Sequence, residues 1–370
     1  MIITYKYRLR LTVAQRIRVA QWIGTCRFIY NMSLGIKKDA YSKSIPLSFN
    51  DLQKQLTDIK DIDWVADVPS QTLQATVQKL EHSYQNFFKR GAGFPKFLSK
   101  NRTNSIYFKS VKYVGNNSFQ LPKIGVIKVY NDRQPSGIPK TASIVKELDK
   151  FYLCVSCEVE TKPSAPCDSQ AGVDVGISNF AVLSDGTIVK HPMFLTHSLA
   201  RLRRVQRKLS RAKKRSKNWY KIVVVLKRLH QKVRRQRQDF LQKLSTTIVM
   251  QNDIVSVEDL NIQGMVRSNL SAQISDSGWG YFKTMLKYKC ELHQKQFVEV
   301  PAYYTSQECY LCGHVSKNNR KTQSEFLCEN CGHKNHADIN GSQNILRRGQ
   351  RLLAKSTDTS LRLAKEPPSL

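Results

Sequence analysis

Three acidic residues in separate parts of the chain have the residue type and surroundings for metal-dependent chemistry. Asp174 lies in AGVDVGISNF, Glu258 in DIVSVEDL and Asp338 in HADINGSQNIL. The β-branched runs around the first two predict central strands of a parallel or mixed sheet, where an unpaired carboxylate is costly. Bound Mg²⁺ would compensate that cost, because carboxylate oxygens are its usual protein ligands. Three convergent carboxylates are typical of two-metal phosphodiester hydrolysis, so we predict all three as catalytic Mg²⁺ ligands.

Four of the nine cysteines form a second candidate metal site. They lie in two CxxC pairs, each followed by Gly-His and separated by 15 residues: Cys309 and Cys312, then Cys328 and Cys331. This spacing predicts a zinc ribbon in which four thiolates surround one structural Zn²⁺. Because four thiolates complete a tetrahedral shell, His314 and His333 are not expected to be ligands. The ribbon lies between Glu258 and Asp338 in the chain, so we expect it to project from the catalytic domain.

The charge balance points to a polyanionic partner. The 370 residues carry 60 Lys and Arg against 28 Asp and Glu, a formal net charge of +32. Such an excess favours nucleic acid over other partners. No apolar stretch approaches the roughly 20 residues of a spanning helix, and the first residues lack a signal-peptide profile. We therefore predict a cytoplasmic protein, associated with the nucleoid when it acts on DNA, with no membrane partner.

The first part of the chain predicts a barrel with a helical insertion. Residues 1–11 alternate between apolar and basic side chains, as a half-buried strand does. Thr12 and Gln15 form a capping-box pattern that opens a helix, and a second helical pattern runs from Ser70 to Phe88. Strand-like segments follow after residue 100. We predict a β-barrel from residues 1–11 and 95–162, interrupted by a helical insertion over residues 12–94.

The second part predicts an α/β nuclease domain, which makes the whole chain an α/β multidomain protein. A Pro- and Ser-rich linker covers residues 161–170, and GVDVGISNFAVLSDGTIV then reads as three strands joined by turns. This is the antiparallel opening of an RNase H-like sheet. We assign residues 163–308 and 332–350 to this domain and 309–331 to the zinc ribbon. Residues 351–370 end in EPPSL and are expected to be a disordered tail.

A helical pair over residues 201–244 carries charge of almost one sign. Asp239 is the only acid in this stretch. A solvent-exposed face usually mixes signs, whereas a basic helix gains by releasing counterions when it lies along phosphates. The residues expected to contact a nucleic-acid backbone are Arg203, Arg204, Arg207, Lys208 and Arg211.

The motifs together resemble the TnpB (OrfB) family, the compact RNA-guided nucleases of insertion sequences that are related to type V CRISPR effectors. The resemblance covers nearly the whole chain: YKYRLRLTVAQ, CRFIYNMSL, GFPKF, LPKIGVIKV, GVDVGISNFAV, VEDLNIQGM, SDSGWGYF, TSQECYLCGH and ADINGSQNIL. It implies a RuvC-type nuclease domain with the three acids as metal ligands. It also implies that the N-terminal barrel is a wedge domain and that its helical insertion is a recognition domain. One departure is that the family's DRDxNAA pattern stands here as His336 to Ser342, which keeps Asp338 and Asn340.

The resemblance also implies the partners. Family members bind a guide RNA from the end of their own element and read a short motif beside the target in double-stranded DNA. The readers lie partly on the helix matching PSQTLQATVQ, so the candidates are Phe49, Ser70, Gln71 and Gln74. Glutamine can pair with adenine in the major groove, which suits an A/T-rich motif. We expect a monomeric ribonucleoprotein.

Three other functions compete with a guided nuclease. A guide-dependent repressor that binds DNA without cutting would have lost acids, whereas all three are present. A transposase proper needs a His-hydrophobic-His pair, and none occurs among the eight histidines. An unguided RuvC-like nuclease remains compatible with the acids alone, and a defined co-purifying RNA would distinguish it.

Overall fold

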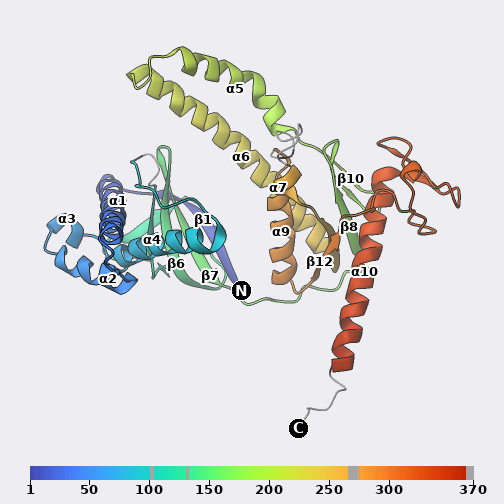
Figure 1. The fold of residues 1–370 in the computed structure, drawn as a ribbon, viewed down its shortest axis with the longest axis horizontal. Helices are drawn as coiled ribbons and strands as arrows, with labels where there is room; N and C mark the ends of the chain where they lie inside the picture. Colours follow the sequence, from blue (N-terminus) through green and yellow to red (C-terminus); the bar gives the residue numbers. More distant parts are fainter. Residues whose placement is uncertain (101–103, 131–132, 266–273, 275, 364–370) are drawn as a thin grey trace, which may run out of the picture. The chain divides into compact units, whose positions relative to one another are not determined.

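The computed structural model describes residues 1–100, 104–130, 133–265, 274 and 276–363, with the side chains of residues 263 and 356–363 left out. The chain forms two compact units, Met1–Glu160 and Thr161–Leu370 (Figure 1). The Pro- and Ser-rich linker predicted over 161–170 thus begins at the boundary between them. Each unit has its own hydrophobic core.

Four helices follow the first strand in the N-terminal unit: α1 (Val13–Ser42), α2 (Phe49–Asp58), α3 (Asp63–Ala66) and α4 (Ser70–Arg90). The predicted capping box is confirmed, because the Thr12 side chain accepts from the Gln15 backbone and the Gln15 side chain accepts from the Thr12 backbone. Helix α4 confirms the helical pattern predicted from Ser70 to Phe88, and it buries Leu73, Val77 and Leu80.

The strands of this unit form one antiparallel seven-stranded sheet in the order β2-β6-β7-β1-β5-β4-β3. Their bounds are β1 (Ile2–Arg10), β2 (Ser105–Phe108), β3 (Lys112–Tyr113), β4 (Ser118–Leu121), β5 (Gly125–Val129), β6 (Ile138–Glu147) and β7 (Lys150–Glu158). In the described part of the chain no ladder joins β2 to β3. The hydrogen-bonded ladders therefore do not close this sheet into the predicted barrel. Strand β3 nevertheless lies near β6.

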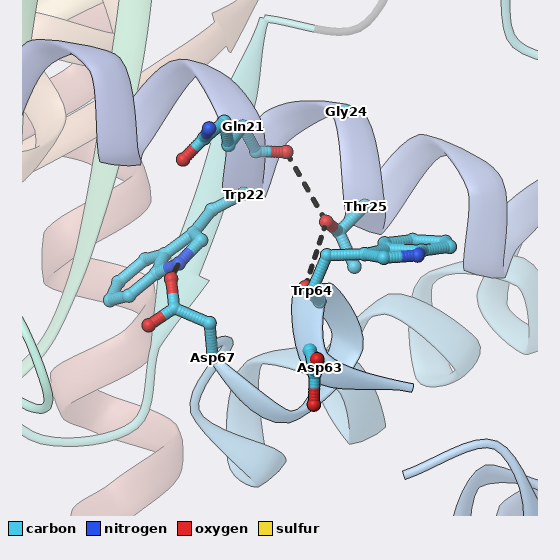
Figure 2. Close-up of a pocket in the computed structure, with 7 residues that line it drawn as sticks. All are labelled: Gln21, Trp22, Gly24, Thr25, Asp63, Trp64 and Asp67. Atoms are coloured by element: carbon cyan, nitrogen blue, oxygen red, sulfur yellow. Dashed lines mark hydrogen bonds between the residues drawn. The ribbon is translucent and has the colours of Figure 1, made fainter. Parts of the chain in front are cut away.

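A pocket of about 540 Å³ lies between α1 and α3 in this unit (Figure 2). Two hydrogen bonds join residues that line this pocket. The indole of Trp22 donates to Asp67 at 2.5 Å, and the Thr25 hydroxyl donates to the Trp64 carbonyl at 3.5 Å. Two carboxylates, Asp63 and Asp67, line the pocket. An acidic lining does not suit a phosphate group, so we do not assign nucleic-acid backbone contacts to it.

The C-terminal unit contains a mixed five-stranded sheet in the order β10-β9-β8-β11-β12. Its strands are β8 (Gln170–Val175), β9 (Asn179–Leu183), β10 (Ile188–Lys190), β11 (Ile254–Asp259) and β12 (Gln296–Pro301). The pairs β8–β9 and β9–β10 are antiparallel, whereas β8–β11 and β11–β12 are parallel. The antiparallel start predicted from the turn residues is thus confirmed.

Helices cover both faces of this sheet. One face packs against α6 (Lys217–Gln251) and α9 (Trp279–Leu292) through a core that includes Val173, Val257 and Leu286. Helix α10 (Ala337–Leu363) contacts β8, β9, β11 and β12. A short helix, α7 (Ile262–Met265), follows β11.

Glycines allow α10 to lie unusually close to the sheet. A Cβ at Gly172 would stand 2.0 Å from the carbonyl oxygen of Ser342, and one at Gly349 would stand 2.0 Å from the Ser256 hydroxyl. Neither position has room for a side chain. At Gly172 the backbone of β8 contacts the backbone of α10, and at Gly349 the backbone of α10 contacts the Ser256 side chain of β11. We call this contact the glycine seam. It fixes the distance between α10 and the strands that it covers.

The basic helical pair is α5 (Phe194–Arg211) and α6, and both helices extend beyond the predicted range of 201–244. Among the described residues, no helix is long and apolar enough to cross a membrane. The prediction of a disordered tail from residue 351 is wrong for most of its length, because α10 continues to Leu363. The sequence RLLAKSTDTSLRL contains neither Pro nor Gly, which explains why the helix can continue. Residues 364–370 lie outside the described part.

Candidate active site and metal centre

Asp174 and Glu258 lie side by side on adjacent parallel strands. Val173 of β8 is in register with Val257 of β11, so the next residue on each strand is one of the two acids. Both valines belong to the core that faces α6 and α9. Because side chains alternate along a strand, the two carboxylates point to the opposite face, which α10 covers.

Helix α10 brings the third acid to the same place. Asp338 is its second residue, and a Cβ at Gly341, one turn later, would stand 3.1 Å from a carboxylate oxygen of Asp174. Burial, followed by the charges of Glu258 and Asp338, raises the pKa of Asp174 well above its ordinary value. Burial also raises the pKa of Glu258. The structure therefore brings together the three acids that the sequence singled out.

The donor set fits hard divalent cations. The charges of Glu258 and Asp338 disfavour the ionised form of Asp174, and positive charge bound among the three carboxylates would offset this repulsion. In the described part of the chain, the only group of potential ligands within 4.8 Å of one another is a set of cysteines.

Two further residues contact these acids, and the sequence analysis missed both. Arg320 donates from Nη2 to the Asp338 carboxylate at 3.1 Å and to the Gln323 carbonyl at 2.9 Å. Thr305 donates from its hydroxyl to Glu258 Oε1 at 2.5 Å, and this bond opposes the rise in the pKa of Glu258. Both partners are far apart in sequence from the acid they hold. The TSQ that precedes the first CxxC was the only sequence signal for Thr305.

The four predicted zinc ligands also converge. Their sulfur atoms all lie within 4.8 Å of one another, with Cys309 3.7 Å from Cys331 and Cys312 3.6 Å from Cys328. A tetrahedron of sulfurs about 2.3 Å from a central Zn²⁺ has edges of about 3.8 Å, so the spacing fits this ion. Neither His314 nor His333 belongs to the cluster.

Each of the two cysteine pairs lies in its own backbone turn, and the two turns have the same hydrogen-bond pattern. The N–H of Gly313 donates to the Cys309 carbonyl at 2.9 Å, and the N–H of Gly332 donates to the Cys328 carbonyl at 3.0 Å. Both glycines have positive φ, +76° and +71°, which explains the Gly after each CxxC. The backbone N–H of His314 lowers the pKa of the Cys312 thiol, which favours the thiolate that binds metal. The ribbon contains η1 (Lys317–Asn319) and β13 (Glu325–Leu327), and β13 pairs with β14 (Lys334–His336), which lies just beyond residue 331.

A buried acid joins the base of the ribbon to α10. The Glu308 carboxylate is held by Arg347 and, at 2.6 Å, by Arg348. Its backbone carbonyl accepts from the side chains of Asn340 at 2.8 Å and Asn344 at 2.7 Å. These bonds fix the start of the ribbon against the helix that carries Asp338.

The predicted nucleic-acid contacts are mostly on the surface. Ser70, Gln71 and Gln74 are exposed on α4, whereas Phe49 is partly buried against the core of the N-terminal unit. Phe49 is thus less suited to reading bases than the other three candidates. The predicted backbone contacts on α5 are all exposed: Arg203, Arg204, Arg207, Lys208 and Arg211.

Comparison with known proteins shows which family this chain belongs to. The OrfB_IS605 family model, described as "Probable transposase", matches residues 152–269. A model described as "Cas12f1-like, TNB domain" matches 279–345, and a helix-turn-helix model matches 1–45. The "Putative RNA-guided DNA endonuclease InsQ" of Escherichia coli K12 is 33% identical over 95% of this chain and 93% of its own length. The chain belongs to the TnpB (OrfB) family.

One further relative and one solved structure were also compared with this chain. A "Putative RNA-guided DNA endonuclease" of Streptomyces pristinaespiralis is 28% identical over 98% of this chain and 92% of its own length. The structure described as "mini-RNA-guided endonuclease CRISPR-Cas_phi3" covers 94% of this chain and 92% of that one, at 10% identity and a TM-score of 0.47. At this score the structural likeness does not establish a shared fold.

Proposed function

We propose that this chain is an RNA-guided DNA endonuclease, in which Asp174, Glu258 and Asp338 hold two Mg²⁺ ions in a RuvC-type site. The observation that carries the proposal is the meeting of these acids, two from adjacent parallel strands and one from the helix that covers them. The mixed sheet, in which β10, β9 and β8 are antiparallel and β8, β11 and β12 are parallel, supports the proposal of an RNase H-like domain. Full-length relatives named as RNA-guided DNA endonucleases support the same activity.

The residues around the acids have distinct roles in this proposal. Metal ions bound there would activate water and stabilise the leaving oxygen of the phosphodiester. Thr305 orients the Glu258 carboxylate through its hydrogen bond. Arg320 holds Asp338 and places a positive charge beside the position of the scissile phosphate. The zinc ribbon carries Arg320, so its fold positions a side chain of the active site.

The guide and the target-adjacent motif use separate surfaces in this proposal. The exposed basic residues of α5 contact the backbone of the guide or of the heteroduplex, because backbone contacts require charge rather than sequence recognition. Ser70, Gln71 and Gln74 on α4 reach base edges of the adjacent motif. Base pairing by the guide reads the rest of the target.

RNA that co-purifies with the protein tests the guided mechanism directly. We expect a high ratio of absorbance at 260 nm to that at 280 nm, and sequencing is expected to give one defined RNA. That RNA should direct cleavage of a matching duplex when its guide segment is reprogrammed. Heterogeneous RNA, with cleavage independent of the guide segment, would instead identify an unguided nuclease.

Substitutions in the two surfaces should have different effects. Replacing Gln71 and Gln74 by Ala should weaken recognition of the adjacent motif, since a good base contact contributes about 1 to 3 kcal/mol of discrimination. Guide affinity should change little. Replacing Arg203, Arg204 and Arg207 by Ala should lower affinity for any RNA and flatten its dependence on salt.

A motif-depletion assay and a salt titration of guide binding measure these two effects. If the glutamine variants keep the wild-type motif profile, α4 is a scaffold, and the readers lie elsewhere. If the arginine variants keep the wild-type salt dependence, α5 does not contact phosphates.

A further inference from the structure

Two neighbouring tyrosines lie on the surface beside the candidate active site. Tyr303 and Tyr304 are 66% and 56% exposed, and they directly precede Thr305, which holds Glu258. Their ring centroids are 6.0 Å apart with the planes at 79°. Two such large rings on the surface, one residue away from a contact to a candidate metal ligand, are not explained by packing of the core.

The backbone that carries these rings is fixed by hydrogen bonds. Arg348 Nη1 donates to the carbonyls of Pro301 at 3.1 Å and Tyr303 at 2.6 Å. The Tyr304 carbonyl accepts from the backbone N–H groups of Gln307 and Glu308, both at 3.0 Å. The rings are therefore attached to a rigid turn, which limits the entropy lost when a ligand stacks on them.

Tyr304 adopts a backbone conformation that a bulky side chain rarely takes. Its φ is +60°, in the left-handed region that favours glycine. Glycine would form this turn with less strain, yet a tyrosine stands there. Strain of this kind is characteristic of functional sites, where the side chain contributes more than its conformation costs.

Charge indicates what the rings contact. The Arg348 guanidinium lies 5.3 Å from the centre of the Tyr303 ring, and its charge lowers the pKa of Glu258. Arg347 and Arg348 share the single Glu308 carboxylate, which leaves a net positive charge beside the exposed rings. Such a surface suits a nucleotide, whose base stacks on the ring while its phosphate is attracted to the positive charge. Thr305 directly follows Tyr304 and bonds Glu258, so a nucleotide bound at the carboxylates would lie close to this turn.

We propose that Tyr303 and Tyr304 form a stacking platform for a base of the single DNA strand that enters the active site. Stacking would hold the adjacent phosphodiester against the three carboxylates without reading sequence, since every base has a flat face. The tyrosines are positioning residues in this scheme. The proposal rests on the proposed function, because it assigns the stacked base to the DNA strand that is cut.

The decisive variant is Tyr304→Gly, which removes the ring and relieves the backbone. We expect its single-turnover cleavage of a guide-matched duplex to fall about 5- to 160-fold, the range that corresponds to loss of one stacked base. The melting temperature should not fall, and target affinity should change little, because base pairing with the guide supplies it. Tyr304→Phe keeps the ring and should cleave at close to the wild-type rate.

Tyr220→Leu is a matched control. This tyrosine is 51% exposed and also belongs to the C-terminal unit, but it lies in the first turn of α6, at the far end of the α5–α6 hairpin from the sheet (Figure 1). With guide in excess, its cleavage rate should be unchanged. Wild-type cleavage by Tyr304→Gly would overturn the proposal. Equal losses in the Gly and Phe variants would assign the effect to the hydroxyl and would also overturn it.

A second measurement separates the platform from the proposed function. Single-stranded oligonucleotides carrying 2-aminopurine should lose fluorescence on binding the wild-type protein and lose clearly less on binding Tyr304→Gly. If guided cleavage is absent in the wild type but this difference persists, the proposed function fails and the platform stands. If the wild type cleaves and the two quenching curves coincide, the platform is refuted.

Discussion

Replacing Asp174, Glu258 or Asp338 by Ala is expected to lower DNA cleavage by on the order of 10³-fold or more, because metal-ion stabilisation of the transition state contributes several kcal/mol. Binding of guide RNA should be nearly unchanged, since that affinity comes from dispersed Lys and Arg contacts. Single-turnover cleavage at saturating guide, measured beside RNA affinity, checks both expectations. Cleavage at the wild-type rate by Asp174→Ala would refute the assignment.

Asp259→Ala is the matched control for these variants. Asp259 directly follows Glu258 at the end of β11, but its side chain is 64% exposed and pairs with Lys283 at 2.9 Å. The same charge is therefore removed one residue away, from a side chain that pairs with Lys283 instead of approaching Asp174. We expect its cleavage rate to stay within about two-fold of the wild type, because an exposed ion pair contributes little to stability. A large loss in this variant would mean that the strand end, rather than the three carboxylates, is sensitive to substitution.

Loss of one zinc ligand should have the second large effect. The reduced protein should contain one Zn²⁺ per chain, and Cys328→Ala should bind far less. Thiolate sites contribute on the order of 10 kcal/mol to local folding, so the ribbon of this variant should unfold. The five-stranded sheet has its own core and should remain folded. Metal analysis and limited proteolysis between residues 309 and 331 check these expectations.

Cys167→Ser serves as the control for the zinc experiment. Cys167 is exposed and lies outside the four-sulfur cluster. The Cys167→Ser variant should keep one zinc and the wild-type proteolysis pattern.

DNA cleavage should also fall in Cys328→Ala, because an unfolded ribbon no longer holds Arg320 against Asp338. A variant that lacks zinc but resists proteolysis would show that the metal does not maintain the ribbon.

The sequence was sufficient for features that depend on local rules. Parallel strands end at one edge of a sheet and side chains alternate, so Asp174 and Glu258 could be placed together from β-branched runs alone. The capping box at Thr12 and the CxxC spacing are likewise short-range patterns, and the structure contains both.

Other features depend on contacts between distant parts of the chain. The position of Arg320 beside Asp338 follows from how the ribbon folds back, which no spacing encodes. The burial of Phe49 depends on packing against a core assembled from several elements. The edges of the N-terminal sheet are β2 and β3, and which strands pair with each other depends on long-range contacts that the sequence pattern does not show. The full length of α10 was not predicted. The Pro pair near the end of the chain indicates an irregular tail, whereas the residues before it contain no Pro or Gly and continue the helix.

The glycine seam makes the active site vulnerable at positions that carry no functional group. A single methyl group at residue 172 would meet the Ser342 carbonyl, so α10 would have to move outward and carry Asp338 away from Asp174. Inactivating substitutions can therefore arise where nothing acidic, basic or metal-binding stands. Among natural variants of this chain, the presence of all three acids is then an incomplete criterion for an active nuclease, and Gly172 and Gly349 should be checked with them.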